Sequence, residues 1–96
     1  MTESILTGSD RRALRAEGQL LPDMVMIGHH GLTDTVRKEL DAQLTRHQLI
    51  KVRATEPDRH VRKVLFEETA QVSAATLIGT VGRTALLFRA NPDAKA

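Results

Sequence analysis

The chain has 96 residues, a net charge of +2, two aromatic side chains and no cysteine. This length allows one small domain, and the absence of cysteine excludes disulfides, zinc ribbons and thiol catalysis. No apolar run approaches the roughly 20 residues that span a bilayer, and the chain does not begin with a basic and then apolar leader. We therefore expect a cytoplasmic protein without a membrane partner.

Positive charge is concentrated in the middle of the sequence. Residues 37–63 contain eight Lys and Arg against four acids, whereas residues 1–36 contain three Arg against five acids. A basic segment in a near-neutral chain indicates a face for an anionic partner, although a solvated helix face gives the same pattern. Because only Phe66 and Phe88 are aromatic, stacking of bases on aromatic rings is not expected. Any nucleic acid would be bound through its backbone and shape.

The first third of the chain predicts a helix and then a short strand. Thr7 or Ser9 can cap the free N–H groups of a helix over residues 11–19, and Pro22 ends it. The apolar run at residues 24–27 then predicts a short buried strand.

A second helix and a second strand follow the loop at residues 28–31. Thr33 is a suitable N-cap, and one stripe of the helix is apolar at every fourth position, at Val36, Leu40 and Leu44. Residues 49–54 alternate in polarity, which is typical of a strand with one buried face and with Lys51 and Arg53 on the other.

The last third predicts one more helix and a β-hairpin. Asp58 caps a helix that ends near Val72. Two strands, at residues 76–81 and 84–88, are separated only by two residues beginning with Gly82, which indicates a hairpin.

These elements give the order α–β–α–β–α–β–β in a single domain over residues 1–90, with an expected disordered tail at residues 91–96. Two β-α-β crossovers predict parallel neighbouring strands, and the terminal hairpin adds an antiparallel one. We expect an α/β (α+β) fold of two layers with a mixed four-stranded sheet. Part of one sheet face should stay open, with Lys51 and Arg53 pointing there.

The sequence does not favour metal binding or catalysis. His29 and His30 are adjacent and expected to project in different directions, and no H-E-x-x-H motif or cysteine ligand accompanies them or the other histidines, His47 and His60. The serines at positions 4, 9 and 73 stand in no nucleophile motif. We expect no catalytic residue, no cofactor, no metal and no small-molecule substrate.

Residues 28–31, Gly-His-His-Gly, form a GxxG pattern between a strand and a helix. Glycines let a backbone approach a phosphate closely, and the N-terminus of the following helix presents free N–H groups. In the KH domain a GXXG loop clamps the RNA backbone. A tight turn gives the same pattern, and residues 79–82 also match GxxG, where we interpret them as strand and turn. The P-loop and G-x-G-x-x-G patterns of nucleotide-binding proteins are absent.

The sequence as a whole resembles the CRM domain (chloroplast RNA splicing and ribosome maturation), in its stand-alone bacterial form, the YhbY-like proteins. The resemblance extends from about residue 5 to 90. Its blocks are Leu6-Thr7, Leu21-Pro22 before VMIG, GLT at residues 31–33, QLIKV at residues 48–52 and VGRTALLFR at residues 81–89.

This resemblance implies a fold similar to the C-terminal domain of translation initiation factor 3, and a role in binding RNA. It also implies association with precursors of the large ribosomal subunit, through the GxxG loop and nearby basic residues. Gly28 and Gly31 match the glycines of the family's loop, Lys51 matches the lysine of its IKV block, and Arg83 matches the basic residue of its terminal hairpin.

Two positions depart from the family's pattern. The family usually has lysine or a polar residue followed by Asn where this chain has His29 and His30. Since a neutral imidazole lacks fixed charge, we hypothesise that binding strengthens as the pH falls. Gly79 interrupts a strand, where it makes a β-bulge possible.

We therefore predict a non-enzymatic, monomeric RNA-binding domain that binds precursor ribosomal RNA during assembly of the large (50S) subunit. The alternative is a protein-interaction module whose basic face docks an acidic protein. The predicted RNA-binding residues are Gly28, His29, His30, Gly31, Leu32, Arg37, Lys38, Lys51, Arg53 and Arg83.

Overall fold

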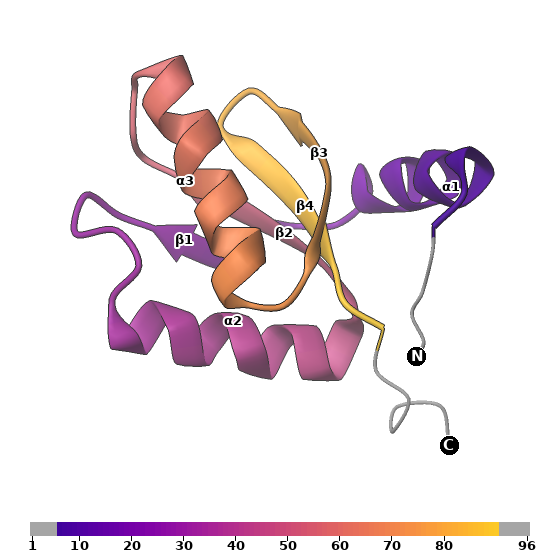
Figure 1. Cartoon of the computed structure of the whole chain (residues 1–96), viewed down its shortest axis with the longest axis horizontal. Helices are drawn as coiled ribbons and strands as arrows, with labels where there is room; N and C mark the ends of the chain where they lie inside the picture. The colour runs from indigo at the N-terminus through magenta and orange to yellow at the C-terminus, as the bar shows by residue number, and fades with distance from the viewer. Residues whose placement is uncertain (1–5, 91–96) are drawn as a thin grey trace.

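The computed structural model describes residues 6–90 as three helices and four strands in the predicted order (Figure 1). The predicted tail at residues 91–96 lies outside the described residues. The elements are α1 (Gly8–Gly18), β1 (Val25–Ile27), α2 (Asp34–His47), β2 (Leu49–Ala54), α3 (Arg59–Val72), β3 (Thr76–Val81) and β4 (Thr84–Phe88).

The ends of the elements follow local capping chemistry. Thr33 and Asp58 cap α2 and α3 as predicted, and β2, β3 and β4 have their predicted bounds. The predicted start of α1 is wrong, because Thr7 alone is the N-cap and the helix begins at Gly8. The Thr7 hydroxyl accepts the Asp10 N–H and the Asp10 carboxylate accepts the Thr7 N–H, each at 3.0 Å, in a capping box. These hydrogen bonds hold the pKa of the Asp10 carboxyl below its usual value.

The strand order is β1-β2-β4-β3, with β1 and β2 parallel and both other pairs antiparallel. The prediction that both crossovers join neighbouring strands is therefore wrong for the second one, because β4 lies between β2 and β3. The side chains explain this position. Ala85, Leu86 and Leu87 of β4 are all buried, which suits a central strand covered on both faces. Thr80 and Val81 of β3 are exposed, which suits an edge.

Helices α2 and α3 cover one face of the sheet and form the main core (Figure 1). Its largest fully buried side chains include Phe66, Ile27 and Leu40. Helix α1 packs on the other face over a smaller cluster of Leu49, Ile78 and Leu86. Its last residue, Gly18, approaches so closely that an added Cβ would lie 2.5 Å from a methyl carbon of Leu86.

Part of the face beneath α1 stays open, as predicted. Met26 of β1 is 50% exposed and Val81 of β3 is 68% exposed. The predicted irregularity is also present, since the β3–β4 register shifts between Leu77 and Gly79. Within residues 6–90 no helix is long and apolar enough to cross a membrane.

One end of the sheet is closed by Arg89, which follows β4. Its guanidinium donates to the Asp41 carboxylate at 2.9 Å, the Ser73 carbonyl at 3.0 Å, the Thr45 hydroxyl at 3.0 Å and the Asp41 carbonyl at 3.2 Å. These acceptors belong to α2 and to the C-cap of α3. A single arginine thus fastens both core helices to the end of the central strand.

Candidate nucleic-acid interface

Three connections meet at the opposite end of the sheet, which we call the loop end. It consists of the GxxG loop (residues 28–31), the link from β2 to α3 (residues 55–58) and the β3–β4 turn (Gly82 and Arg83). Backbone hydrogen bonds join these segments: the Thr55 N–H donates to the Ile27 carbonyl at 3.0 Å, and the Ala54 N–H donates to the Arg83 carbonyl at 2.9 Å. The end of β2 thus connects the GxxG loop on one side to the hairpin on the other, although the loop and the hairpin lie far apart in the sequence.

The GxxG loop is a compact turn that leads directly into a capped helix. The Gly31 N–H donates to the Gly28 carbonyl at 3.0 Å, and the Thr33 N–H donates to the Gly31 carbonyl at 3.0 Å. The Thr33 hydroxyl then accepts the Val36 N–H at 3.2 Å. Leu32 packs its half-buried side chain against the main core and so anchors the loop. Among residues 6–90, no hydrogen-bond acceptor faces the N–H groups of His29, His30 and Leu32.

The described structure explains only one of the two glycines of the loop. Gly31 has φ of +74°, a conformation that favours glycine. Gly28 lies outside that left-handed region, and a Cβ added there would meet no atom within 4 Å. Neither backbone conformation nor packing inside the described structure explains a glycine at position 28.

The two loop histidines lie together, which corrects the prediction that they project in different directions. Their ring centroids are 4.2 Å apart with an interplanar angle of 37°, and both residues are exposed. A turn permits this arrangement, whereas consecutive side chains alternate sides only in an extended strand. No group of three or more His, Cys, Asp or Glu side chains suited to a metal occurs in the described part of the chain.

The structure separates the predicted basic residues into three places. Arg53 lies beside Met26 on the open sheet face and opposite Thr84, which follows Arg83, so Arg53 and Arg83 belong to the loop end. The Arg53 guanidinium is 3.8 Å from the Asp23 carboxylate. Lys51 lies one row further along the same face, in a pocket with the end of α1 and with Val81.

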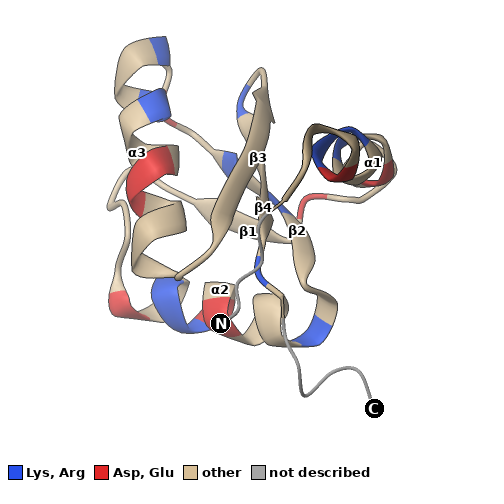
Figure 2. Ribbon diagram, turned by 45° about the vertical axis from the view of Figure 1, so that its right-hand side comes forward, with Lys and Arg blue, Asp and Glu red and all other residues tan. Residues whose placement is uncertain are grey.

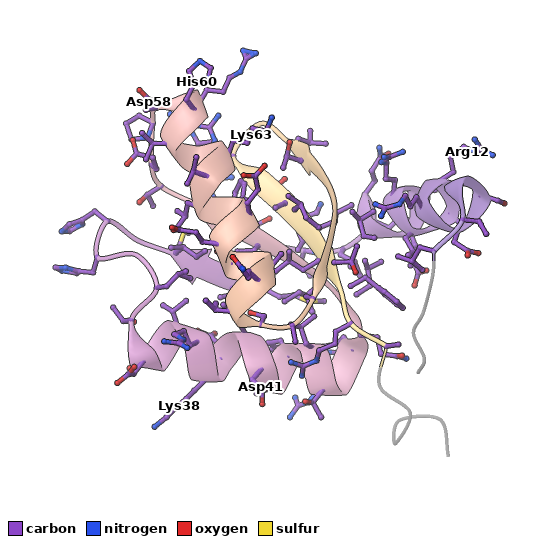
Figure 3. All side chains as sticks on the ribbon, in the orientation of Figure 1. Arg12, Lys38, Asp41, Asp58, His60 and Lys63 are labelled. Atoms are coloured by element: carbon purple, nitrogen blue, oxygen red, sulfur yellow. The ribbon has the colours of Figure 1, made fainter. Side chains whose placement is uncertain are left out.

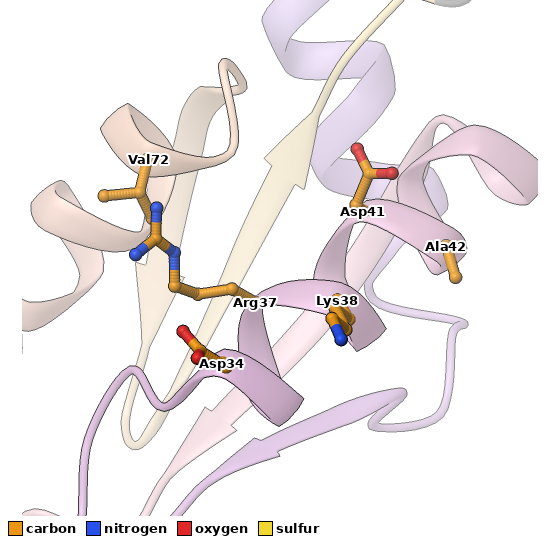
Figure 4. Close-up of a pocket in the computed structure, with 6 residues that line it drawn as sticks. All are labelled: Asp34, Arg37, Lys38, Asp41, Ala42 and Val72. Atoms are coloured by element: carbon orange, nitrogen blue, oxygen red, sulfur yellow. The ribbon is translucent and has the colours of Figure 1, made fainter.

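Arg37 and Lys38 lie on the outer surface of α2 rather than at the loop end. They line a shallow groove of about 510 Å³ together with Asp34, Asp41, Ala42 and Val72. Arg37 extends toward Val72 of α3, whereas Lys38 points away from the protein (Figures 3 and 4). Because two carboxylates line the same groove, this surface is of mixed charge and less suited to a polyanion than the loop end.

The structure also places basic residues at the loop end that were absent from the predicted set. Arg59, Arg62 and Lys63 occupy the first half of α3 and face the β3–β4 hairpin across a pocket. Figure 2 shows the resulting separation along α3, with basic residues near its start and acidic ones further along. Their sequence signal was the basic segment at residues 37–63, but its position beside the hairpin depends on the tertiary fold.

Comparison with known proteins agrees with the resemblance seen in the sequence. A family model described as the CRS1 / YhbY (CRM) domain matches residues 6–89. The relative named "Probable RNA-binding protein PA4753" from Pseudomonas aeruginosa is 32% identical over 87 residues, covering 91% of this chain and 84% of the relative. An "RNA-binding protein" from Haemophilus influenzae is 29% identical over 90 residues, covering 94% and 91% respectively.

A solved structure supports the same assignment. The solution structure of the Staphylococcus aureus protein SAV1595 superposes with a TM-score of 0.81 at 25% sequence identity and covers 91% of both chains. The two proteins share the mixed α/β architecture described above. Given the family match over nearly all described residues and a relative above 30% identity, the chain belongs to the CRS1/YhbY (CRM) domain family.

Proposed function

We propose that this protein binds RNA through the loop end and acts, without catalysis, in assembly of the large ribosomal subunit in the cytoplasm. Its RNA target would be precursor ribosomal RNA, and the protein would act as a monomer. The names of the bacterial relatives support the RNA-binding part. The ribosomal part comes from the resemblance of the sequence to YhbY-like proteins.

Gly28 carries the proposal for the site. Glycine usually serves a backbone conformation, tight packing or the close approach of another molecule. The first two reasons do not apply at position 28, where φ is outside the left-handed region and an added Cβ has no neighbour within 4 Å. Close approach of an external group remains, and it fits an RNA backbone lying directly against the loop.

The atoms around Gly28 suit a phosphate. The N–H groups of His29, His30 and Leu32 have no acceptor within the described structure, and charged phosphate oxygens are strong acceptors for such groups. Two exposed imidazoles stand on the same loop. Arg53 and Arg83 extend positive charge along the loop end, while Arg37 and Lys38 offer weaker contacts further along α2.

The decisive variant is Gly28→Asp, which places a side chain and a negative charge where the phosphate would lie. We expect its affinity for transcribed large-subunit ribosomal RNA to fall at least about tenfold, from steric exclusion and charge repulsion. Its co-sedimentation with large-subunit precursor particles should be lost. The melting temperature should stay near that of the wild type, because the site is open.

Gly8→Asp is the matched control. It makes the same substitution at an equally open glycine, but at the start of α1, where a carboxylate is favourable. It should bind RNA like the wild type. Equal binding by Gly28→Asp would show that the loop is not the site. Co-sedimentation that survives nuclease digestion would instead favour an acidic protein partner.

A further inference from the structure

A second basic feature lies at the loop end, between the first half of α3 and the β3–β4 hairpin. We call it the basic notch: it is a pocket of about 190 Å³ lined by Arg59, Arg62, Lys63, Phe66, Thr80 and Gly82. Lys63 extends from α3 toward the side on which the hairpin lies (Figure 3). The volume is below the roughly 300 Å³ at which small-molecule sites begin. It therefore suits one small charged group rather than a whole nucleotide.

The positive charges of the notch lie near the N-terminal end of α3, where a helix disfavours cations. Cations are unfavourable at the positive N-terminal end of a helix, and like charges four residues apart repel each other. Nevertheless, Arg59 and Lys63 stand four residues apart in the first half of α3, which has no acid in its first turn and no base in its last. This arrangement costs stability unless an anion binds between the cations.

Two acids precede α3, and one of them, Asp58, interacts electrostatically with Arg62 of the notch. The Asp58 carboxylate caps α3 by accepting the N–H groups of Val61 and His60, and these bonds hold its pKa below the usual value. The Glu56 carboxylate accepts the Asp58 N–H at 3.0 Å. Neither acid forms an ion pair with a residue of the notch within residues 6–90. Both carboxylates are thus engaged by backbone groups.

The three cations differ in how firmly they are held. Arg62 donates to the carbonyls of Glu56 at 2.9 Å and Pro57 at 3.2 Å, which fixes its guanidinium beside the link from β2. Arg59 and Lys63 make no hydrogen bond or ion pair with the rest of the described structure. One positioned guanidinium and two cations without a partner among the described residues surround a small cavity, which suits a tetrahedral oxyanion such as a phosphate group.

We infer that the basic notch is a second phosphate-binding site, separate from the GxxG loop, and that its ligand in the cell is a backbone phosphate of the RNA. The identity of the ligand rests on the proposed function, whereas the chemistry of the notch does not. Phosphates held at the loop and at the notch would fix the direction in which an RNA strand crosses the loop end.

The first test uses inorganic phosphate as the probe and does not depend on RNA binding. In a titration at constant ionic strength, with chloride as the reference salt, backbone amide signals of residues 59–63 and 80–83 should shift and saturate. Arg59→Gln/Lys63→Gln should abolish the saturable shifts. The control Arg12→Gln/Arg46→Gln removes the same charge from exposed sites on α1 and the far end of α2, and it should retain them.

The second test asks whether the phosphate belongs to RNA. With transcribed large-subunit ribosomal RNA, the slope of log affinity against log salt should become shallower by about 0.7–0.9 in Arg59→Gln/Lys63→Gln, as expected for one lost phosphate contact. The control pair should keep the wild-type slope. If the notch variant loses phosphate binding but keeps the RNA slope, the assignment to RNA is overturned and the notch binds free phosphate.

Thermal stability separates a binding role from a structural one. Removing repelling cations from the N-terminal end of α3 should leave the melting temperature unchanged or raise it slightly. A marked fall would mean that Arg59 and Lys63 support the fold, and unchanged phosphate shifts would mean that no site exists; either result overturns the proposal. If Gly28→Asp binds RNA normally while the notch tests succeed, only the proposal for the loop fails.

Discussion

The two ends of the sheet use arginine in opposite ways. At one end, the Arg89 side chain is 21% exposed and its guanidinium makes four hydrogen bonds to α2 and the α3 C-cap. At the loop end, Arg59 and Lys63 make none within the described residues, and Arg53 makes one long ion pair of 3.8 Å. Arg89 thus stabilises the fold at the first end, whereas at the second end Arg62 donates to two backbone carbonyls but Arg59 and Lys63 are exposed and without a partner among the described residues.

This difference shows that the position of a positive charge says less about function than its partners do. A guanidinium that satisfies a buried carbonyl is part of the fold, since its loss leaves an acceptor without a donor. An unpartnered cation among other cations weakens the fold slightly and becomes favourable only when an anion arrives. Variants that move stability at one end and affinity at the other test this separation.

The largest effect on stability is expected from Arg89→Ala. It removes the donors of the Ser73 carbonyl and the Asp41 carbonyl, and Ser73 is a buried residue. We expect a loss of about 2–3 kcal/mol in the free energy of unfolding, measured by urea denaturation. RNA affinity should remain near the wild-type value under conditions where the variant is folded.

Arg83→Ala is the matched substitution at the loop end. Its side chain is exposed and, within residues 6–90, it forms no ion pair. We expect the reverse result, with stability within about 0.5 kcal/mol of the wild type and weaker, less salt-dependent RNA binding. If both variants changed stability and binding together, the two ends would not be functionally distinct.

The two loop glycines provide a finer comparison within the loop end. Gly31→Ala forces a Cβ onto a residue with φ of +74° and should cost about 1–2 kcal/mol of stability. Gly28→Ala meets no neighbour and should leave stability unchanged, while weakening RNA binding through the methyl group alone. If Gly28→Ala bound RNA with full affinity, the RNA backbone would not lie directly against position 28.

Local signals predicted most of the secondary structure of this protein. Thr33 and Asp58 marked helix starts, and alternation in residues 49–54 gave β2 its bounds and placed Lys51 and Arg53 on the less buried face. The start of α1 is different from the predicted one because two reciprocal hydrogen bonds between Thr7 and Asp10 select Thr7 as the N-cap. These are interactions between residues close in sequence, so the sequence pattern carries nearly all of the information.

Tertiary features were harder to predict. The position of β4 between β2 and β3 follows from its burial on both faces, which no short motif encodes. The notch is formed by the first half of α3 and by the β3–β4 hairpin, which are separated in the sequence by the rest of α3 and most of β3. In the sequence, its cations are therefore visible only as part of a basic segment. The placement of Arg37 over an α2–α3 groove depends likewise on how the two helices pack.

The smallest predicted effect concerns the histidines that stand on the loop. Histidine gains positive charge as the pH falls from about 7.5 to 6, and an exposed charge contact is worth about 0.5–1 kcal/mol, so RNA affinity should rise about twofold to fivefold over this range. His29→Lys/His30→Lys, which carries fixed charge, should abolish the part of this rise that comes from the loop. His60 stands at the start of α3 and His47 at the end of α2, so His60→Gln measures any contribution from the notch and His47→Gln serves as the distant control. A wild-type profile as flat as that of the lysine variant would show that the imidazoles act only as neutral hydrogen-bonding groups.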